Sequence, residues 1–341
     1  MHVFVTGATG FVGSAVVREL LAAGHRVTGL VRNAERAAAR AATGATPHEG
    51  DLHDAAGIAK AARSTDAVIH TAFIHDFSNF GASIAVEQQV VPAIGEALAG
   101  SGKPFLVTSG TGLLPKGRVD EDTLPATEGH AARRGAVETL ALGFADRGVR
   151  VGIVRLPFSV HGRGDRGFVP ALIETARRTG VSGQVEDGGN LWPAVHRDDA
   201  ARLYRLALEA DVPMPRYHAV GEAGIPFRDI AAAIAKALGV PVRSVSREAA
   251  LAHFGWIGGF AGLDILAASD KTRAALGWTP TGPGLIADLE IAGYFESWSA
   301  SPSPASSSAS MSRRTSGERK SASTRSPSAN EVSSRNRRSG A

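Results

Sequence analysis

Apolar and polar residues alternate along the first 160 positions in blocks that predict strands and helices in turn. Short runs of β-branched and aromatic residues predict strands, and longer stretches with apolar residues three or four positions apart predict helices. Strands that alternate with helices at this spacing indicate a parallel sheet with helices on both faces. The expected strands cover residues 2–6, 26–31, 45–49, 66–71, 103–109 and 150–156, and the expected helices cover residues 11–22, 33–42, 83–98 and 127–147.

The turn between the first strand and the first helix contains Gly7, Gly10 and Gly13. Gly7 allows a tight turn out of the strand, Gly10 allows a diphosphate to approach the backbone, and Gly13 allows the helix to lie close to the sheet. The first amide groups of a helix have no partner within it, and its dipole favours an anion there. A glycine turn with a strand before it and a helix after it predicts a dinucleotide site.

The rhythm of strands and helices becomes irregular after residue 160. A strand is expected at 192–196 and helices at 168–178, 197–209 and 226–238, with Asp198 or Asp199 as the cap of the second of these helices. The predicted fold class is therefore α/β, with a Rossmann-type, doubly wound parallel sheet and a smaller C-terminal substrate lobe. The expected domains are a dinucleotide-binding domain over 1–160, whose sheet later segments complete, a mixed α/β substrate lobe over 161–298, and a tail over 299–341.

The string TGATGFVG, residues 6–13, resembles the short-chain dehydrogenase/reductase superfamily in its extended, epimerase/dehydratase-like branch. Less specific similarity lies at 155–168 and 192–200, and the resemblance spans about residues 2–295. It implies that a nicotinamide cofactor contacts the glycine turn and the segments that follow the third, fourth and sixth strands. The residues implied are Thr6, Gly7, Ala8, Thr9, Gly10, Phe11, Val12, Gly13, Asp51, Leu52, Thr71, Ala72, Phe73 and Pro157.

The residue after the second strand indicates which cofactor is preferred. An acid at this place accepts from the ribose 2′-hydroxyl of NAD, whereas a 2′-phosphate needs a cation. The strand ends at Leu30-Val31-Arg32 with no acid, and Arg32 can form a fork onto a phosphate. We therefore expect NADP, with NAD possible, although a solvated surface arginine is the plainer interpretation.

The residues expected to carry the chemistry depart from the superfamily's pattern. The resemblance implies a Tyr-x-x-x-Lys pair, but the chain has only Tyr204, Tyr217 and Tyr294, and none has a Lys four positions later. Counting back from Glu138, which resembles the Glu after that Lys, places Arg134 at the Lys position and His130 at the Tyr position. Arginine cannot lose its proton but can hold the cofactor ribose, whereas histidine titrates near neutral pH. The predicted catalytic residues are Ser109, which would hold the substrate oxygen, His130 and Arg134.

Other side chains near the same strand ends are candidates for substrate binding. His75, His161 and His196 compete with His130 as the acid or base, and for each of them a structural role is the plainer interpretation. Thr111 is the nearest substitute for Ser109, whose own hydroxyl could simply bond backbone. The predicted substrate-binding residues are Thr111, His75, His161 and Trp192.

These features favour an NAD(P)-dependent oxidoreductase that acts on a carbonyl or alcohol of a small molecule. A nucleotide-sugar epimerase or dehydratase is an alternative, and so is a non-catalytic NADP-sensing regulator, which the missing tyrosine and lysine favour. No metal site is expected, because the histidines are scattered and the chain has no cysteine.

Composition sets the expected surroundings. Residues 301–341 hold eight Lys or Arg and two Glu, a net charge of +6, so the first 300 residues carry −2 and no nucleic-acid partner is expected. The serine-rich and arginine-rich tail is expected to be disordered. With no leader pattern, no apolar span and no cysteine, we expect a cytoplasmic protein, monomer or homodimer, that does not bind membranes.

Overall fold

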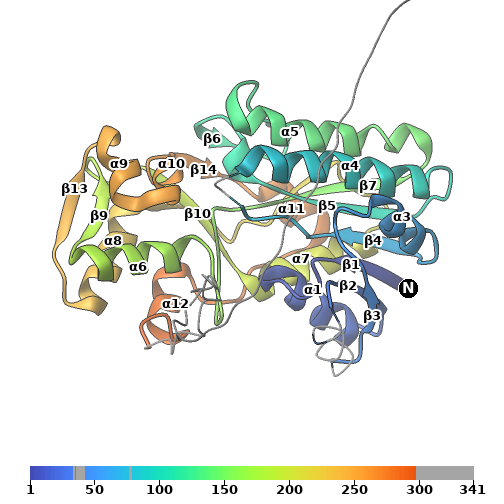
Figure 1. The fold of residues 1–341 in the computed structure, drawn as a ribbon, viewed down its shortest axis with the longest axis horizontal. Coiled ribbons are helices and arrows are strands. Elements are labelled where there is room, and N and C mark those ends of the chain that lie inside the picture. Colours follow the sequence, from blue (N-terminus) through green and yellow to red (C-terminus); the bar gives the residue numbers. More distant parts are fainter. Residues whose placement is uncertain (34, 36–42, 77–78, 297–341) are drawn as a thin grey trace, which may run out of the picture. The chain divides into compact units, whose positions relative to one another are not determined.

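Seven strands pair in parallel to form the central sheet of the protein (Figure 1). The computed structural model describes residues 1–296 apart from 34, 36–42 and 77–78, so most of the helix expected at 33–42 and the tail lie outside the described residues. The strand order is β11-β7-β5-β4-β1-β2-β3, which confirms the doubly wound sheet predicted from the sequence. The strands are β1 (His2–Thr6), β2 (Arg26–Val31), β3 (Thr46–Glu49), β4 (Ala67–His70), β5 (Pro104–Gly110), β7 (Arg150–Leu156) and β11 (Arg216–His218).

Helices cover both faces of this sheet, because each apolar strand presents side chains to both sides. Val3 and Val5 of β1 pack with helices α1 and α7, whereas Phe4 packs with α3, α4 and α5. Figure 1 shows α4 and α5 above the sheet and α1 and α7 below it. The bounds are α1 (Phe11–Ala22), α3 (Ala55–Arg63), α4 (Phe80–Leu98), α5 (Gly129–Leu142) and α7 (Arg197–Glu209).

The strand register places the expected site residues along one edge of the sheet. Thr6 lies beside His70, and His70 lies beside Val107 of β5, so β1 and β4 end side by side and β5 runs three residues further, to Gly110. Gly110 lies beside Leu156, the last residue of β7. The segments that follow these strands therefore meet at the carboxyl edge, where doubly wound sheets bind ligands.

The remaining strands form three small sheets, which sequence periodicity largely missed. Trp192 and Phe227 belong to the apolar core that these sheets share with the later helices. The strands are β8 (Ser159–His161), β10 (Leu191–His196) and β12 (Glu222–Pro226) in one sheet, β9 (Ser182–Val185) with β13 (Val242–Val245), and β6 (Gly117–Val119) with β14 (Ile265–Ala267). The helices are α6 (Phe168–Thr179), α8 (Phe227–Leu238), α9 (Arg247–Phe254), α10 (Gly258–Ala261), α11 (Asp270–Leu276) and α12 (Leu285–Ile291).

Two local expectations were wrong. The cap of α7 is His196, whose Nδ1 accepts from the Asp198 amide at 3.3 Å, and neither Asp198 nor Asp199 takes this role. Asp199 is buried and instead accepts from the amides of Thr281 and Gly282 at 3.0 and 2.8 Å. The helix expected at 127–147 ends at Leu142, since the backbone turns into a short 3₁₀ helix after Gly143.

Candidate functional site

The glycine turn between β1 and α1 is packed too closely for side chains. Gly7 has a φ of +68°, and a Cβ there would lie 2.7 Å from Thr71 Oγ1. A Cβ on Gly13 would lie 2.1 Å from the carbonyl oxygen of Gly7. Glycine at these two positions therefore lets the turn, the first turn of α1 and the end of β4 share one small space.

The N-terminus of α1 lacks a side-chain cap. Gly10 occupies the cap position with no side-chain hydrogen bond, and the first turn of the helix contains no acid. The Gly10 amide donates to the Gly7 carbonyl at 2.8 Å, which holds the turn closed. Uncapped amides at a positive helix end suit a diphosphate, so the predicted residues 6–13 fit the cofactor chemically.

Thr6 joins this turn to the end of β4. Its hydroxyl oxygen accepts from the Ala72 amide at 3.3 Å and lies 2.8 Å from His70 Nδ1. Burial, and to a smaller extent the Arg134 charge, lower the pKa of His70 to about 4, so this imidazole is neutral at pH 7.

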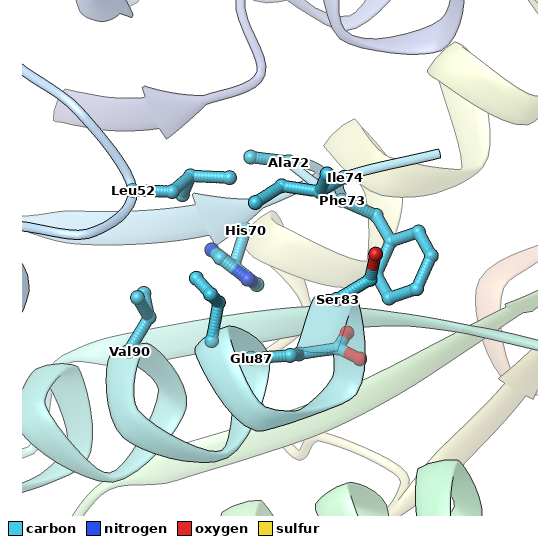
Figure 2. Close-up of a pocket in the computed structure, with 9 residues that line it drawn as sticks. Leu52, His70, Ala72, Phe73, Ile74, Ser83, Glu87 and Val90 are labelled. Atoms are coloured by element: carbon cyan, nitrogen blue, oxygen red, sulfur yellow. The ribbon is translucent and has the colours of Figure 1, made fainter. Parts of the chain in front are cut away.

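A small cavity lies beneath the β4 loop (Figure 2). It measures about 10 Å³, enough for about one water molecule. His70 Nε2 is buried and has no hydrogen-bond partner among the described residues. Three of the predicted cofactor residues share this cavity with helix α4. Its lining is Leu52, His70, Ala72, Phe73, Ile74, Ser83, Val86, Glu87 and Val90.

The ends of β2 and β3 present a cation and an acid. Arg32 is exposed, as a side chain that meets a 2′-phosphate must be. Asp51 accepts from the backbone amide of His53 at 2.8 Å and lies 2.5 Å from His53 Nδ1. The His53 amide, then its ring and the Arg32 charge, lower the pKa of Asp51. Asp51 is thus a carboxylate, already engaged with His53.

Ser109 lies at the carboxyl end of β5, but its hydroxyl is committed to a protein partner. It donates to Glu138 Oε1 at 2.6 Å. Glu138 also accepts from Arg155 Nε at 3.0 Å and Nη2 at 2.6 Å, and all three side chains are buried. The hydroxyl oxygen can still accept a hydrogen bond, so substrate binding by Ser109 stays a prediction.

Arg134 is held in place by two groups. Its Nε donates to Glu87 Oε2 at 3.2 Å, and its guanidinium carbon lies 3.9 Å from the centre of the Phe73 ring. Glu87 is buried on α4, which raises its pKa although the Arg134 charge opposes that rise. The backbone of His130 is part of α5, but its side chain lies outside the described residues.

The four predicted substrate residues are not brought together in one place. His75 is exposed after β4, with its ring 5.3 Å from Phe73. Thr111 and Trp192 are buried, and neither Thr111 Oγ1 nor Trp192 Nε1 has a hydrogen-bond partner in the described part of the chain. The Trp192 ring lies 5.3 Å from Phe158, which follows Pro157.

His161 lies on β8 and pairs with an acid from the C-terminal segment. Its Nδ1 is 2.7 Å from Asp288 Oδ2, and its ring is 5.6 Å from His196. Burial lowers the pKa of His161, although Asp288 opposes this shift. A neutral imidazole fixed by a carboxylate is a possible base, but here it lies wholly within the protein.

Sequence reasoning missed Glu87, His70 and Asp288. A signal for Glu87 was present, since it is an acid among the apolar residues Ile84, Val90 and Val91 on the buried face of a helix. Asp288 gave no such signal, because its partner lies 127 positions earlier. Within the described ranges, no group of three or more His, Cys, Asp or Glu side chains could hold a metal ion, and no helix is long and apolar enough to cross a membrane.

Comparisons with known proteins agree with this geometry. The model of the NAD dependent epimerase/dehydratase family matches residues 3–220. The uncharacterized protein C2A9.02 of Schizosaccharomyces pombe is 46% identical over 297 residues, which are 86% of this chain and 100% of the yeast protein. A 2-alkyl-3-oxoalkanoate reductase of Stenotrophomonas maltophilia is 27% identical over 71% of this chain and 77% of its own.

The fold is also similar to that of solved enzymes. The structure of MoeE5 in complex with UDP-glucose and NAD has a TM-score of 0.68 and 23% identity, and covers 86% of this chain and 98% of its own. UDP-glucuronic acid 4-epimerase from Bacillus cereus, in complex with UDP-glucuronic acid and NAD, has a TM-score of 0.70 and 19% identity over 86% of this chain and 99% of its own.

Proposed function

The chain belongs to the NAD dependent epimerase/dehydratase family, and from this premise we propose that it is an NAD(P)-dependent oxidoreductase that interconverts a carbonyl and an alcohol on a small molecule. The observation that carries the proposal is the uncapped α1 N-terminus at the carboxyl edge of the sheet, beside Thr71, which follows β4, the strand next to that of Ser109. The names of distant relatives, two of them ketone reductases, support carbonyl chemistry.

The chain's own residues would divide the work as follows. The amides at the start of α1 would bind the diphosphate, and residues 71–73 would contact the bound cofactor. When bound, the nicotinamide supplies or accepts a hydride. Ser109 Oγ, whose proton goes to Glu138, would accept a hydrogen bond from the substrate hydroxyl, and Arg134 would provide a fixed positive charge. The proton that accompanies the hydride would be exchanged by His130, the residue at the tyrosine position.

The experiment that tests this proposal has two parts. Calorimetric titration with NADP and NAD measures whether either cofactor binds, and the loss of NADPH absorbance over a panel of ketones and aldehydes measures turnover. We expect binding in the micromolar range and oxidation of NADPH by at least one carbonyl. A folded protein that binds neither nucleotide at millimolar concentration would refute the proposal.

We further propose that NADP is preferred, through Arg32. The change Arg32→Ala should weaken NADP binding at least tenfold and NAD binding less than twofold, because only the 2′-phosphate needs the guanidinium. Calorimetry with both nucleotides measures the two losses. Arg18→Ala is the control, since Arg18 is also an exposed arginine and pairs with Asp198 away from this strand end. Equal losses for the two nucleotides would contradict the assignment of Arg32.

A second candidate function is an NADP sensor without catalysis. The specific observation is the environment of Tyr204: its hydroxyl lies 2.6 Å from Thr108 Oγ1, and burial raises its pKa. Tyr204 is fully buried against Thr108 and does not reach a substrate, and the chain has no Tyr-x-x-x-Lys pair. A sensor would bind NADPH tightly and oxidise it with none of the carbonyl compounds.

A further inference from the structure

The guanidinium of Arg134 is fixed before any ligand arrives. Glu87 accepts only from its Nε, and the ring of Phe73 lies against its flat face. The side chain of Arg134 is 18% exposed and that of Glu87 is 4% exposed, so the pair is largely out of solvent. Figure 2 shows Glu87 and Phe73 lining the same cavity from different elements, α4 and the β4 loop. Arg134 therefore loses little freedom when it binds something.

The outer edge of the same guanidinium is free. Among the described residues, neither terminal amino group of Arg134 makes a hydrogen bond, although an arginine has five N–H donors. The side chain of Arg134 keeps 18% of its surface exposed, so these donors can be reached by a ligand that supplies acceptors. The two terminal amino groups point the same way and match two coplanar oxygen atoms.

The charge nearby favours an anion as the source of these oxygens. Arg134 is followed by no acid until Glu138, which is occupied by Ser109 and Arg155. Among the described residues, Arg134 pairs with one acid, Glu87, and burial raises the pKa of the Glu87 carboxyl group. Within α5 the adjacent Arg133 adds a second positive charge, and its Nη1 is 3.6 Å from the point where a Cβ on Gly81 would lie.

Helix geometry relates this free edge to Ser109. Arg134 and Glu138 are four positions apart on α5 and thus face the same side, about 6 Å apart along the axis. Glu138 accepts the hydroxyl proton of Ser109 at 2.6 Å. A ligand could therefore place its carboxylate on Arg134 and a second oxygen near Ser109 if its carboxylate and that oxygen are only a few bonds apart.

We propose that Arg134 binds the carboxylate of the substrate, which is an oxo acid or the matching hydroxy acid with the two groups a few bonds apart. This inference rests on the proposed oxidoreductase function for the carbonyl, but the carboxylate site stands on Arg134, Glu87 and Phe73. Glu87 is a positioning residue in this scheme: it acts through Arg134 and does not touch the substrate.

The test measures binding and does not depend on turnover. The full-length protein saturated with NADP⁺ is titrated by calorimetry with 3-oxooctanoate and with 2-heptanone, which is the same ketone without its carboxylate. Oxidised cofactor cannot reduce either compound, so both titrations report equilibrium affinity. We expect the acid to bind at least tenfold more tightly than the ketone, and its advantage to shrink as salt concentration rises.

Substitutions then locate the effect. The double change Glu87→Gln with Arg134→Met avoids leaving a buried carboxylate without its partner, and it should bring the two affinities to within threefold. Arg134→Lys, which keeps the charge without the fork, should lose most of the preference. Arg147→Met is the matched control: Arg147 also pairs an acid of α4, Glu96, but both side chains are exposed, so the preference should not change.

Three results would overturn the inference. One is equal affinity of the acid and the ketone, or binding of neither, in the wild-type protein loaded with cofactor. Another is a preference for the acid that survives in the double variant. The third is a loss of NADP⁺ affinity of tenfold or more in that variant, which would assign Arg134 to the cofactor ribose. If the wild type binds no nucleotide, the proposed function fails, and the same titrations on the free protein still decide whether Arg134 binds the carboxylate.

Discussion

At the scale of single residues, the candidate site depends on glycines, which have no side chain, and on buried polar side chains. Gly7 and Gly13 allow the turn to pack closely, and the neutral ring of His70 contacts Thr6, the residue before the turn. Gly7 and Gly13 could be identified from their spacing alone, because a strand and a helix flank them. The pairing of His70 could not, since Thr6 and His70 are 64 positions apart.

A methyl group at Gly13 tests the close packing of the turn. Gly13→Ala places a Cβ 2.1 Å from the Gly7 carbonyl, so we expect a loss of about 1–3 kcal/mol in the free energy of unfolding and at least a tenfold weaker cofactor affinity. Urea unfolding and calorimetry measure the two effects. Gly259→Ala is the control, because a Cβ there meets nothing within 4 Å. Normal cofactor affinity in the Gly13 variant would show that the turn is not the diphosphate site.

Asp165 should make stability depend on pH. It accepts from the Gly167 amide at 2.7 Å and from the Tyr294 hydroxyl at 3.0 Å, and burial raises its pKa to about 6. Because the folded pKa lies above the unfolded value of about 3.9, its stabilising contribution is complete below pH 4 and is lost as pH rises through 6.

Asp165→Asn removes this titration. We expect the variant to gain stability relative to wild type as pH rises from 4 to 7, by up to about 3 kcal/mol, since a shift of one pH unit corresponds to about 1.4 kcal/mol. Urea unfolding at pH 4.5, 5.5, 6.5 and 7.5 measures the difference. A difference that is constant over this range would show that Asp165 titrates normally.

At the scale of elements, one buried ionic cluster fastens α5 to the ends of β5 and β7. Glu138 of α5 accepts from Ser109 of β5 and from Arg155 of β7, and Arg216 of β11 lies 3.4 Å from its Oε2. Arg155 also donates to the Thr123 carbonyl at 2.8 Å. This cluster fixes the position of Ser109 and places Arg134 one helical turn away.

Removing the negative charge of this cluster should be costly. Glu138→Gln leaves buried Arg155 without its counter-ion, so we expect a loss of about 3–5 kcal/mol in the free energy of unfolding by urea. Glu96→Gln is the control, because it breaks an exposed pair with Arg147 and should not shift the unfolding midpoint. Similar midpoints for the two variants would mean that the cluster contributes little.

The strands of the main sheet could be predicted, and those of the small sheets largely could not. Each main strand is a run of apolar residues that is visible locally, as in β4 and β7. By contrast, β6 is the sequence Gly-Arg-Val and exists because it pairs with β14, about 150 positions later. A segment with so little apolar character becomes a strand only through its distant partner, which periodicity does not detect.

At the scale of the whole molecule, the fold and the cofactor edge followed from the sequence, whereas the grouping around Arg134 did not. The spacing to Glu138 located Arg134, but its contacts with Glu87 and Phe73 depend on how α4 and the β4 loop pack against α5. Of the expected substrate residues, Trp192 lies in the apolar core that the small sheets share, and His161 lies on β8 beside His196 of β10.

The serine-rich and arginine-rich end of the chain should be dispensable. The yeast relative C2A9.02 is matched over its full length by 86% of this chain, so the remainder has no counterpart in it. We expect a protein that ends at Ser299 to melt within about 2 °C of the full-length protein. Its cofactor affinity should stay within twofold of that of the full-length protein. Thermal unfolding and calorimetry on both lengths test this. A large drop in either quantity would give the tail a role in the folded protein.

The direction of β1 has a practical consequence. The strand runs from His2 to Thr6, so Met1, whose ammonium lies 3.3 Å from His25 Nδ1, is at the edge of the sheet opposite the glycine turn, roughly 15 Å away along the strand. Figure 1 marks this end at the periphery of the molecule. An affinity tag, a sensor-chip linkage or a fused cofactor-recycling enzyme attached ahead of Met1 would therefore leave from the end of β1 opposite the glycine turn.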